Sequence, residues 1–503
     1  MALNVSTPLI PKSPLVRTSL WFVLIAFGCL LFADIEITTQ DPWPEIKRLG
    51  IGLIQPNFAK WKQILEALMM TLAFAILGVA LANFTGFLLA VVFHYRAVRV
   101  GCAFVRAVHE LFWALIFLQV FGLTALTGVL AIAIPYSGIC AKVYAELLEE
   151  ADPAPMQAIP NGTSIVSMFF YAKLPGVWAN VKTYSFYRLE CGLRSSAVLG
   201  FVGLPTLGFY LETAYKEGLY SDLSALLIVF YVLISTVRKW MRREIIPVLL
   251  IAACIVLPES GAMTWSNAWR FFADDIMPTP IRNAETITIP ILLETWFWFQ
   301  SLIVNEALPG ILNTVVLTMI ALAATGFLSL LFFPIISSLF FGSKSRLAGH
   351  VILVVIRSTP EYVIAFVLLQ LLGPSMFPAV VALSFHNAAI IGHLIGNFTN
   401  HLRLRPDRSN GINLYAYETL PRIYPQFLAF LFYRWEVIFR ETAILGILGV
   451  KTLGFFVDSA FADIRFDRAI VLIIITALLN IIIDVLSRSI RSRLRLQTSL
   501  DTH

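Results

Sequence analysis

Two arginines and a glutamate recur at one spacing in two otherwise apolar stretches of this chain. The first half of the chain, residues 1–243, is called copy one, and the second half, residues 244–503, is called copy two. Copy one contains Arg188, Glu190 and Arg194. The same residue types return 246 positions later in copy two as Arg434, Glu436 and Arg440. A charge in a membrane-spanning helix costs about 2.5–3.5 kcal/mol even on a lenient scale, so such residues usually serve a purpose. Arginine binds carboxylates and phosphate-like oxyanions through a planar fork of N–H groups. The pattern therefore predicts anion binding or a buried ion-pair network.

These two interpretations stay open at the level of sequence. In each copy the glutamate precedes the second arginine by four residues, a spacing at which helical side chains form ion pairs. Further glutamates of the third apolar stretch, Glu110 in copy one and Glu361 in copy two, are candidate partners. Both roles can coexist, because a paired arginine keeps other N–H donors for an anion. We expect the fifth stretches of the two copies to line a central substrate path, with Arg194 or Arg440 in contact with the anion.

Other reactive patterns are weak. His386-Asn387 offers neutral donors to an oxyanion, but copy one has Pro135-Tyr136 at that place, which favours a packing role for the histidine. The sequence shows no catalytic triad, no metal-ligand spacing and no nucleotide-binding loop. We therefore expect no catalytic residue and no metal site, and ATP must bind to another protein.

The composition predicts an integral membrane protein. The chain is 58% hydrophobic and 14% charged, with a mean hydropathy of +0.80, which leaves too little polar surface for a water-soluble globule. The net charge of +6 comes from basic residues at the ends of apolar segments, as in cytoplasmic membrane flanks. No basic stripe interleaved with aromatic residues is present, so nucleic acid is not an expected partner.

Apolar segments of membrane-spanning length occur about six times in each copy. The expected fold is an all-α polytopic membrane protein with about 12 spans in two parallel repeats of six. Basic clusters at Arg238–Arg243 and Arg488–Arg495 place both termini in the cytoplasm and residues 259–305 outside. The expected spans are 18–33, 67–93, 105–120, 123–146, 177–202 and 220–237, then 244–258, 308–340, 348–371, 377–398, 425–449 and 468–487.

A cytoplasmic loop at about 145–175 carries a recognisable pattern. Acidic residues open it, a glycine permits a sharp turn, and a Leu-Pro pair begins the next span; the residues are Glu146, Glu149, Glu150, Ala151, Gly162, Leu174 and Pro175. The loop resembles the EAA-type coupling motif of binding-protein-dependent ABC importer permeases, which contacts the ATPase subunit. Together with the repeated arginine motif, the chain looks like two phosphonate-type permease units of the type I importer class, fused.

The resemblance implies a set of partners and a substrate class. It implies a pair of cytoplasmic ABC ATPase subunits that carry ATP and magnesium, a periplasmic substrate-binding protein, and a place in the bacterial inner membrane. The expected substrate is phosphonate or a related oxyanion such as phosphite or hypophosphite, with the choice left to the binding protein. A secondary anion transporter built from parallel repeats is the alternative, and a membrane enzyme or assembly factor a third.

Copy two departs from the family pattern at the corresponding loop, about 397–421. Leu420 and Pro421 are present, but the stretch His401–Arg408 has no acidic opening and Gly411 lies only ten residues before the proline. The sequence therefore leaves open whether copy two couples to an ATPase in the same way.

Overall fold

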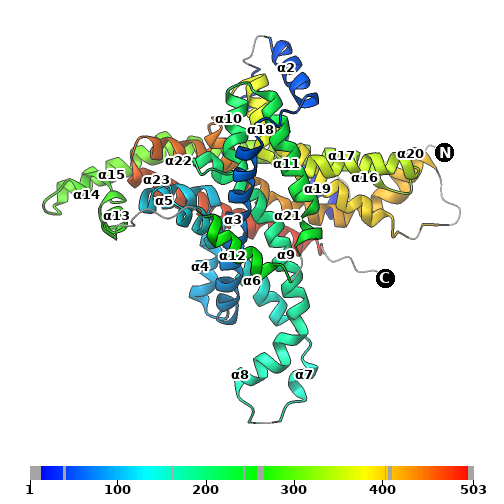
Figure 1. The fold of residues 1–503 in the computed structure, drawn as a ribbon, viewed down its shortest axis with the longest axis horizontal. Coiled ribbons are helices and arrows are strands. Elements are labelled where there is room, and N and C mark those ends of the chain that lie inside the picture. The colour runs from blue at the N-terminus through cyan, green and yellow to red at the C-terminus, as the bar shows by residue number, and fades with distance from the viewer. Residues whose placement is uncertain are drawn as a thin grey trace, which may run out of the picture. The chain divides into compact units, whose positions relative to one another are not determined.

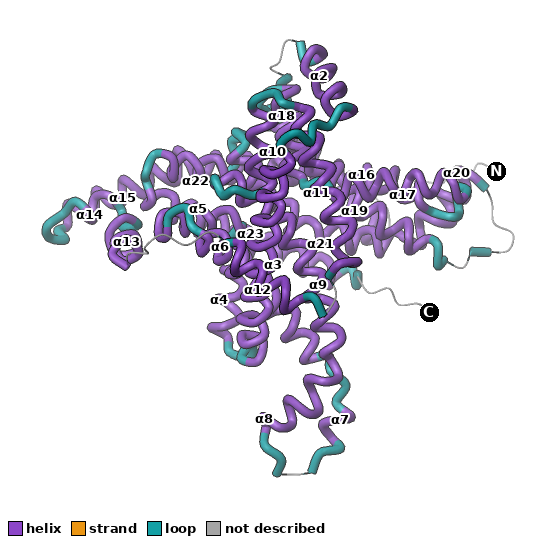
Figure 2. Tube along the Cα trace, viewed as in Figure 1, coloured by secondary structure: helices purple, strands orange, loops and turns teal. Residues whose placement is uncertain are grey.

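The structure, a computed structural model, describes residues 13–37, 41–160, 162–241, 244–257, 265–402, 404–405 and 410–496. These residues form helices joined by short loops, and no strand occurs among them (Figure 2). Figure 1 labels the elements in chain order. Copy one contains α1 Pro14–Leu30, α2 Trp43–Ile54, α3 Trp61–Val91, α4 Arg96–Ala107, α5 Glu110–Phe121, α6 Ala125–Glu149, α7 Ala154–Gln157, α8 Ile165–Met168, η1 Phe169–Lys173, α9 Leu174–Val198, η2 Leu199–Val202, α10 Leu207–Lys216 and α11 Tyr220–Trp240.

Copy two repeats this order behind a longer entry segment. Its elements are α12 Ile246–Val256, α13 Trp265–Arg270, η3 Phe271–Asp275, α14 Thr279–Arg282, α15 Ile289–Leu302, η4 Ile303–Ala307, α16 Leu308–Ile336, α17 Ser343–Ser358, α18 Glu361–Leu372, α19 Met376–Thr399, α20 Gly411–Asn413, η5 Leu414–Thr419, α21 Leu420–Ile447, α22 Leu453–Ala462 and α23 Phe466–Arg493.

The chain divides into two compact units. The copy-one unit comprises Trp43–Leu292 and Arg465–Leu478, and the copy-two unit comprises Met1–Pro42, Leu293–Ile464 and Leu479–His503. These units do not coincide with the two repeats that meet at residue 243. The first helix of each copy, α1 or α12, is called its entry helix here, and it packs within the unit of the other copy. In the copy-two unit, Phe22 of α1 makes edge contacts with Phe432 and Trp435 of α21. In the copy-one unit, Ala253 of α12 packs with Ala73 and Ile76 of α3.

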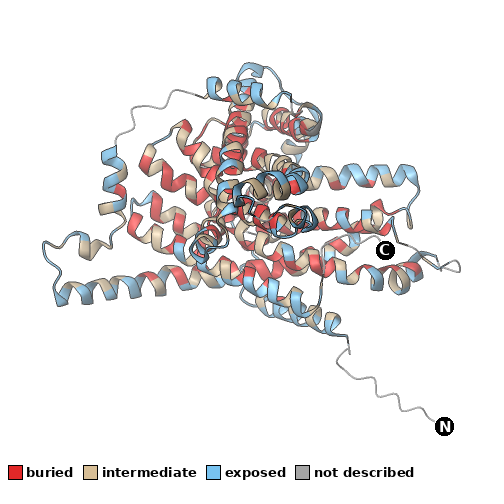
Figure 3. Cartoon of the chain, turned by 90° about the horizontal axis from the view of Figure 1, so that it is seen from below, coloured by how far each residue is buried: buried red, intermediate tan, exposed pale blue. Residues whose placement is uncertain are grey.

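Each unit is built around one long helix and a closely packed neighbour. In the copy-one unit, Gly78 and Gly86 of α3 lie directly against Ile132 and Cys140 of α6. The copy-two unit has the same arrangement in α16 and α19, where Gly396 lies against Ile336. Small residues allow such close helix approach in membrane proteins, where van der Waals packing holds helices together. Figure 3 shows that most helices have buried residues on one side and exposed residues on another. Many of the exposed residues are large and apolar, among them Leu65, Phe84 and Leu88 of α3.

The described residues contain six helices that are long and apolar enough to cross a membrane, or up to nine if each bent pair is counted as one span. The six are Trp61–Val91, Ala125–Glu149, Tyr220–Val237, Ile289–Ile336, Met376–Thr399 and Phe466–Arg493. The all-helical membrane fold is thereby confirmed, whereas the number of 12 spans stays a prediction. Helices α1 and α12 are apolar but shorter than this length.

The third expected span of each copy is broken rather than continuous. Helices α4 and α5 meet at an angle of 92°, and α17 meets α18 at 82°. In copy two the break falls at Pro360, which lacks an N–H group and holds the preceding Thr359 in an extended conformation. In copy one His109 takes the N-cap position, where its Nδ1 accepts from the N–H of Leu111 at 3.1 Å. The expected straight spans 105–120 and 348–371 are therefore corrected to sharply bent pairs.

Proline also shapes the entry to the fifth span. Helix α9 begins at Leu174 and α21 at Leu420, as expected for a Leu-Pro start, and a π-helical turn, η1 or η5, leads directly into each of them. Proline has no N–H to donate into the preceding turn, which suits a locally wider turn there. Each fifth helix thus reaches several residues further toward the preceding loop.

Candidate functional site

Arg188 on α9 lies among three tyrosines of the copy-one unit. Its Nε donates to the hydroxyl of Tyr184 at 2.8 Å. Its guanidinium carbon lies 5.2 Å from the ring centre of Tyr136, 5.3 Å from that of Tyr184 and 5.8 Å from that of Tyr187. Aromatic faces attract a guanidinium without neutralising it. Arg188 is thus held half-buried as a positive charge, a suitable state for attracting an anion.

Arg194 lies further along the same helix, with one charged contact in reach. Its Nη2 is 3.9 Å from Glu190 Oε1, and both side chains are about a quarter exposed. This separation is at the outer limit of an ion pair, well beyond the 2.7–2.9 Å of a strong one. The Nε atom of Arg194 is buried and has no hydrogen-bond partner. The glutamate therefore engages only part of the arginine, and a directed N–H donor remains for a ligand.

Glu110, proposed above as a partner of the arginines, joins a hydrogen-bonded chain to α9. Ser195 Oγ donates to Glu110 Oε1 at 2.7 Å, and the hydroxyl of Tyr136 lies 2.8 Å from Ser195 Oγ. Sequence reasoning missed Ser195 and gave Tyr136 no role. The position of Ser195 next to Arg194 was the only available signal. The chain ties α5, α6 and α9 together beside the arginines.

The copy-two unit places a different set of polar residues at the same repeat positions. Glu361 Oε2 at the start of α18 lies 3.5 Å from His386 Nε2 on α19. Asn387 Nδ2 donates to Glu441 Oε2 of α21 at 3.2 Å. Glu441 occupies the repeat position of Ser195, and Asn387 that of Tyr136. Sequence reasoning missed Glu441, although it directly follows Arg440. The other predicted residues of this copy, Arg434, Glu436 and Arg440, lie half-buried on α21.

A tight turn fixes the end of the arginine helix in each unit. Gly203 and Gly449 adopt φ angles of +91° and +98°, which favour glycine. The chain then folds back so closely that a Cβ on Gly208 would overlap the carbonyl oxygen of Ala197. The next helix is anchored to the long one, since Leu207 N donates to Thr71 Oγ1 at 2.9 Å and Leu453 N to Thr314 Oγ1 at 3.0 Å. The repeated glycines are therefore required by geometry.

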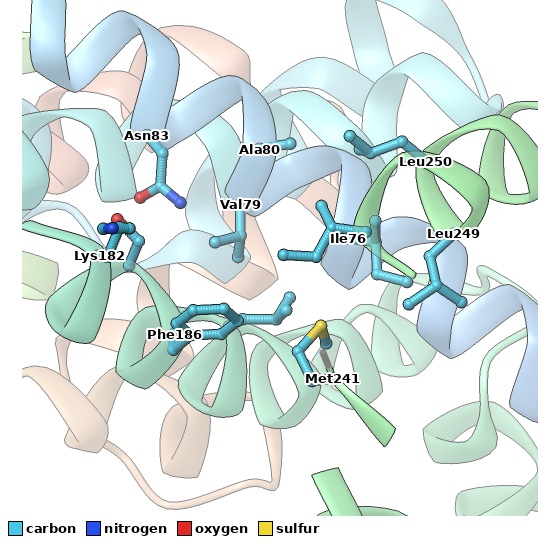
Figure 4. A pocket seen from close by; sticks show the side chains of 12 residues that line it. Ile76, Val79, Ala80, Asn83, Lys182, Phe186, Met241, Leu249 and Leu250 are labelled. Atoms are coloured by element: carbon cyan, nitrogen blue, oxygen red, sulfur yellow. The ribbon is translucent and has the colours of Figure 1, made fainter. Parts of the chain in front are cut away.

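A pocket of about 200 Å³ lies beside another face of α9 in the copy-one unit. In Figure 4 Asn83 and Lys182 lie at one end, and Ile76, Leu249, Leu250 and Met241 line the rest. Nearly all of its walls are apolar, so this pocket does not suit a free oxyanion. Its lining residues come from α3, α9 and α12 together with Met241, and none of the arginines of α9 is among them.

The expected coupling loop of copy one extends beyond the ends of α6 and α9. Helix α6 ends at Glu149, Glu150 follows as its C-cap, and the short helices α7 and α8 form the tip of the loop (Figure 1). Glu146 lies 3.8 Å from Lys142, while Glu149, Glu150 and Ala151 end α6 near the surface. Gly162 has a φ of +100°, and a Cβ at this residue would meet no other atom within 4 Å. The loop thus presents an exposed acidic helix end and a turn that favours glycine.

The corresponding loop of copy two is described only in part. Arg403 and residues 406–409 lie outside the described residues, as do Arg242 and Arg243 of the basic cluster used for orientation. Gly411, with a φ of +64°, begins α20 and leads through η5 to Leu420 and Pro421. The copy-two loop therefore also uses a glycine turn before its Leu-Pro pair.

Comparison with known proteins is consistent with this arrangement. Residues 330–496 match the family of binding-protein-dependent transport system inner membrane components. The chain is 30% identical over 231 residues to the phosphite transport system permease protein PtxC of Stutzerimonas stutzeri, covering 43% of this chain and 84% of that protein. It is 25% identical over 425 residues to the phosphate-import permease protein PhnE of Mycolicibacterium smegmatis, covering 79% of this chain and 77% of that protein.

A third relative matches a shorter stretch. The putative cryptic phosphonate transport system permease protein PhnE2 of Escherichia coli is 31% identical over 107 residues, covering 21% of this chain and 88% of that protein. No solved structure matches the chain. The chain belongs to the family of binding-protein-dependent transport permeases, which are multi-pass inner-membrane components of ABC transport systems. The resemblance inferred from the coupling loop and the arginine motif is thereby confirmed.

Proposed function

We propose that this chain is the transmembrane permease subunit of an ATP-driven ABC importer for phosphonate or a related phosphorus oxyanion such as phosphite. The related permeases carry the names phosphate-import, phosphite and phosphonate transport proteins, which supports a tetrahedral phosphorus oxyanion as the substrate class. The observation that carries the proposal is the pair of half-buried arginines on α9, repeated on α21. A dianion that sheds its water needs such cations, held on rigid helices.

In this proposal Arg188 and Arg194 have different tasks. Arg188, held by aromatic faces, attracts the anion by its charge. Arg194, whose buried Nε has no partner, donates hydrogen bonds to an oxyanion oxygen. The long contact with Glu190 keeps the site from binding too tightly, because the glutamate offers a competing acceptor when the anion leaves. Arg434 and Arg440 provide the corresponding charges in copy two.

The partners follow from the same proposal. A periplasmic binding protein delivers the anion, and cytoplasmic ABC ATPase subunits, a pair of them, bind ATP and magnesium. The copy-one loop with Glu146, Glu150 and Gly162 docks on an ATPase subunit, and the copy-two loop makes a second, different contact. The permease itself carries out no covalent chemistry. In this proposal both termini of the chain lie in the cytoplasm.

Uptake by proteoliposomes tests this function. The chain is reconstituted with its ATPase and binding protein, and entry of phosphite, methylphosphonate and phosphate into the vesicles is measured. ATP or a non-hydrolysable analogue is enclosed in the vesicles, on the side of the membrane where the ATPase subunits lie. We expect uptake of at least one phosphorus oxyanion that requires ATP hydrolysis and the binding protein. Uptake that is driven by an ion gradient without ATP would instead identify a secondary anion transporter.

A further inference from the structure

A second polar site in the copy-two unit has the composition of a metal centre. Glu361, His386 and Glu441 each offer a ligand atom, and these atoms all lie within 4.8 Å of one another. In the part of the chain that the structure describes, this is the one such group of three. The residues come from α18, α19 and α21, so three packed helices determine its geometry. From this site we propose that Glu361, His386 and Glu441 bind a divalent transition metal ion of the Zn²⁺ type.

The imidazole of His386 is oriented for ligation. Its side chain is almost fully buried, and Nδ1 lies 2.9 Å from the backbone carbonyl oxygen of Thr359. A carbonyl oxygen only accepts, so Nδ1 carries the proton and donates. The other nitrogen, Nε2, then faces Glu361 Oε2 at 3.5 Å. Metal-binding histidines typically donate their second ring N–H to a carbonyl or carboxylate in this way, which fixes the tautomer.

The donor set of the site suits a cation. Two carboxylates and an imidazole nitrogen that converge within 4.8 Å inside a helix bundle are attractive to a divalent ion, because the ion reduces the repulsion between the carboxylates. One nitrogen and two carboxylate oxygens suit Zn²⁺, Mn²⁺ or Co²⁺ better than Ca²⁺, which takes six to eight oxygen ligands. A divalent ion would bring the sum of these charges to zero.

Asn387 supplies an independent indication. The residue is completely buried, its Nδ2 donates to Glu441 Oε2 at 3.2 Å, and its Oδ1 has no hydrogen-bond partner. A buried amide oxygen without a partner is costly and needs an explanation, such as a bound ion or water. Asn387 thus acts as a positioning residue that holds the Glu441 carboxylate.

Copy one provides an internal comparison. At the same repeat positions it has Glu110, Tyr136 and Ser195, which form a hydrogen-bonded chain with a single carboxylate. Pro135 stands there in place of His386. Copy one also has an imidazole near its carboxylate, since His109 Nε2 lies 3.9 Å from Glu110 Oε2. The second carboxylate at this place is therefore the feature that distinguishes copy two. Metal binding at this place does not depend on which anion is transported.

The test uses the purified full-length permease in its transporter complex, without transport. After treatment with chelator and dialysis, Co²⁺ is added as a spectroscopic probe and bound metal is counted by mass spectrometry. We expect about one ion per chain, with an absorption spectrum of a low-symmetry site that Zn²⁺ displaces. Glu361→Gln and Glu441→Ser should weaken binding by more than about 100-fold, and Asn387→Leu by about 10- to 100-fold, the range for residues behind a ligand.

The matched control is Glu110→Gln, which removes the equivalent carboxylate of copy one and should leave metal binding unchanged. Metal should also raise the thermal unfolding temperature of the wild type and of Glu110→Gln but not of Glu361→Gln, because ligand binding to the folded state stabilises it. The proposal is wrong if the wild type binds no metal, if Glu361→Gln and Glu441→Ser bind as well as the wild type, or if Glu110→Gln loses the ion too.

Discussion

At the scale of single residues, the arginine helix combines a held charge with an open donor. Arg188 is stacked among tyrosines, and Arg194 makes a long contact with Glu190 while its Nε lacks a partner. A purely structural arginine would be expected to satisfy its donors in short, two-pronged contacts. The geometry therefore favours an anion contact over a closed ion pair.

Substitutions of Arg194 test this difference through uptake. Arg194→Ala should reduce transport by about 10- to 100-fold, because it removes a charged hydrogen-bond donor worth about 1.5–3 kcal/mol. Arg194→Lys keeps the charge but loses the planar fork, so it should retain a fraction of the activity. Initial uptake rates at equal membrane levels give the comparison.

The double variant Glu190→Gln, Arg194→Gln separates the two interpretations. If the arginine only balances the glutamate, removal of both charges should restore normal uptake, since no unpaired charge remains in the helix. Recovery would rule out the anion contact, and continued loss in a well-inserted protein would support it. Arg440→Ala in copy two reports whether the two copies contribute equally.

The repeated glycine turn allows a prediction about stability. Gly208→Ala should destabilise the folded protein by about 1–3 kcal/mol or more, because the new Cβ would overlap the backbone of Ala197. Gly176→Ala on the same α9 helix is the control, since nothing lies within 4 Å of that position. Alanine there should be neutral or stabilising by about 0.5–1 kcal/mol. Thermal unfolding in detergent measures both, and equal unfolding temperatures would contradict the close approach.

At the scale of elements, the loop between α6 and α9 is the best candidate for passing the movement of the ATPase subunits during ATP hydrolysis to the membrane helices. It ends α6 with exposed acidic residues and carries two short helices at its tip. A π-helical turn then leads into the arginine helix. A movement of the loop would therefore reach Arg188 and Arg194 along one continuous helical segment.

Changes in this loop should uncouple transport from ATP hydrolysis without unfolding the membrane domain. Gly162→Phe, or charge reversal at Glu146 and Glu150, is expected to lower uptake by about tenfold or more. A tenfold change corresponds to a loss of about 1.4 kcal/mol in the free energy of docking between the loop and the ATPase subunit. ATPase activity in the assembled complex and uptake are measured together. Normal uptake in these variants would remove the docking assignment.

Gly411→Phe in copy two is the matched control for the glycine change. Both glycines adopt a positive φ, so the backbone strain of a substitution is similar at the two positions. The copy-two loop lacks the acidic opening, and we therefore expect a smaller effect on uptake. Equal losses in the two variants would indicate that both loops dock in the same way.

At the scale of the whole molecule, the two compact units do not follow the order of the chain. Helix α1 contributes to the copy-two unit, and α12 to the copy-one unit. Such an exchange makes each unit depend on both halves of the sequence. If residues 1–243 and 244–503 were expressed separately, the copy-one unit would lack α12 and the copy-two unit would lack α1. Co-expression of the two halves would supply both helices.

Cysteine labelling tests the expected orientation of the whole chain. In a variant without the five native cysteines, Asn283→Cys should react with an impermeant thiol reagent added from outside, while Glu244→Cys and Ser492→Cys should not. All three positions are exposed in the structure, so differences in labelling report the side of the membrane rather than burial. The inverse pattern would overturn the cytoplasmic placement of both termini and of the coupling loop.

The membrane environment, the internal repeat and the arginine motif could all be predicted from the sequence alone. Long apolar segments predict helices because every backbone group in a bilayer must be paired within the segment. The acidic loop after α6 and the spacing of Arg188, Glu190 and Arg194 could also be recognised in the sequence, since they depend on residues close in the chain, while the coupling role of the loop stays a prediction. Pro360 gave a local signal for the bend of the third span, but its angle of 82° depends on packing.

Contacts between residues that are distant in the sequence became visible only in the folded chain. Glu361, His386 and Glu441 lie on three helices and form no motif in sequence, because their convergence follows from how α18, α19 and α21 pack. The same holds for Ser195 with Glu110, and for the exchange of α1 and α12 between the units. In an apolar segment many helix faces are equally hydrophobic, so periodicity cannot select a neighbour. Small residues at the contacts make that choice, and their effect is visible only when the helices are packed.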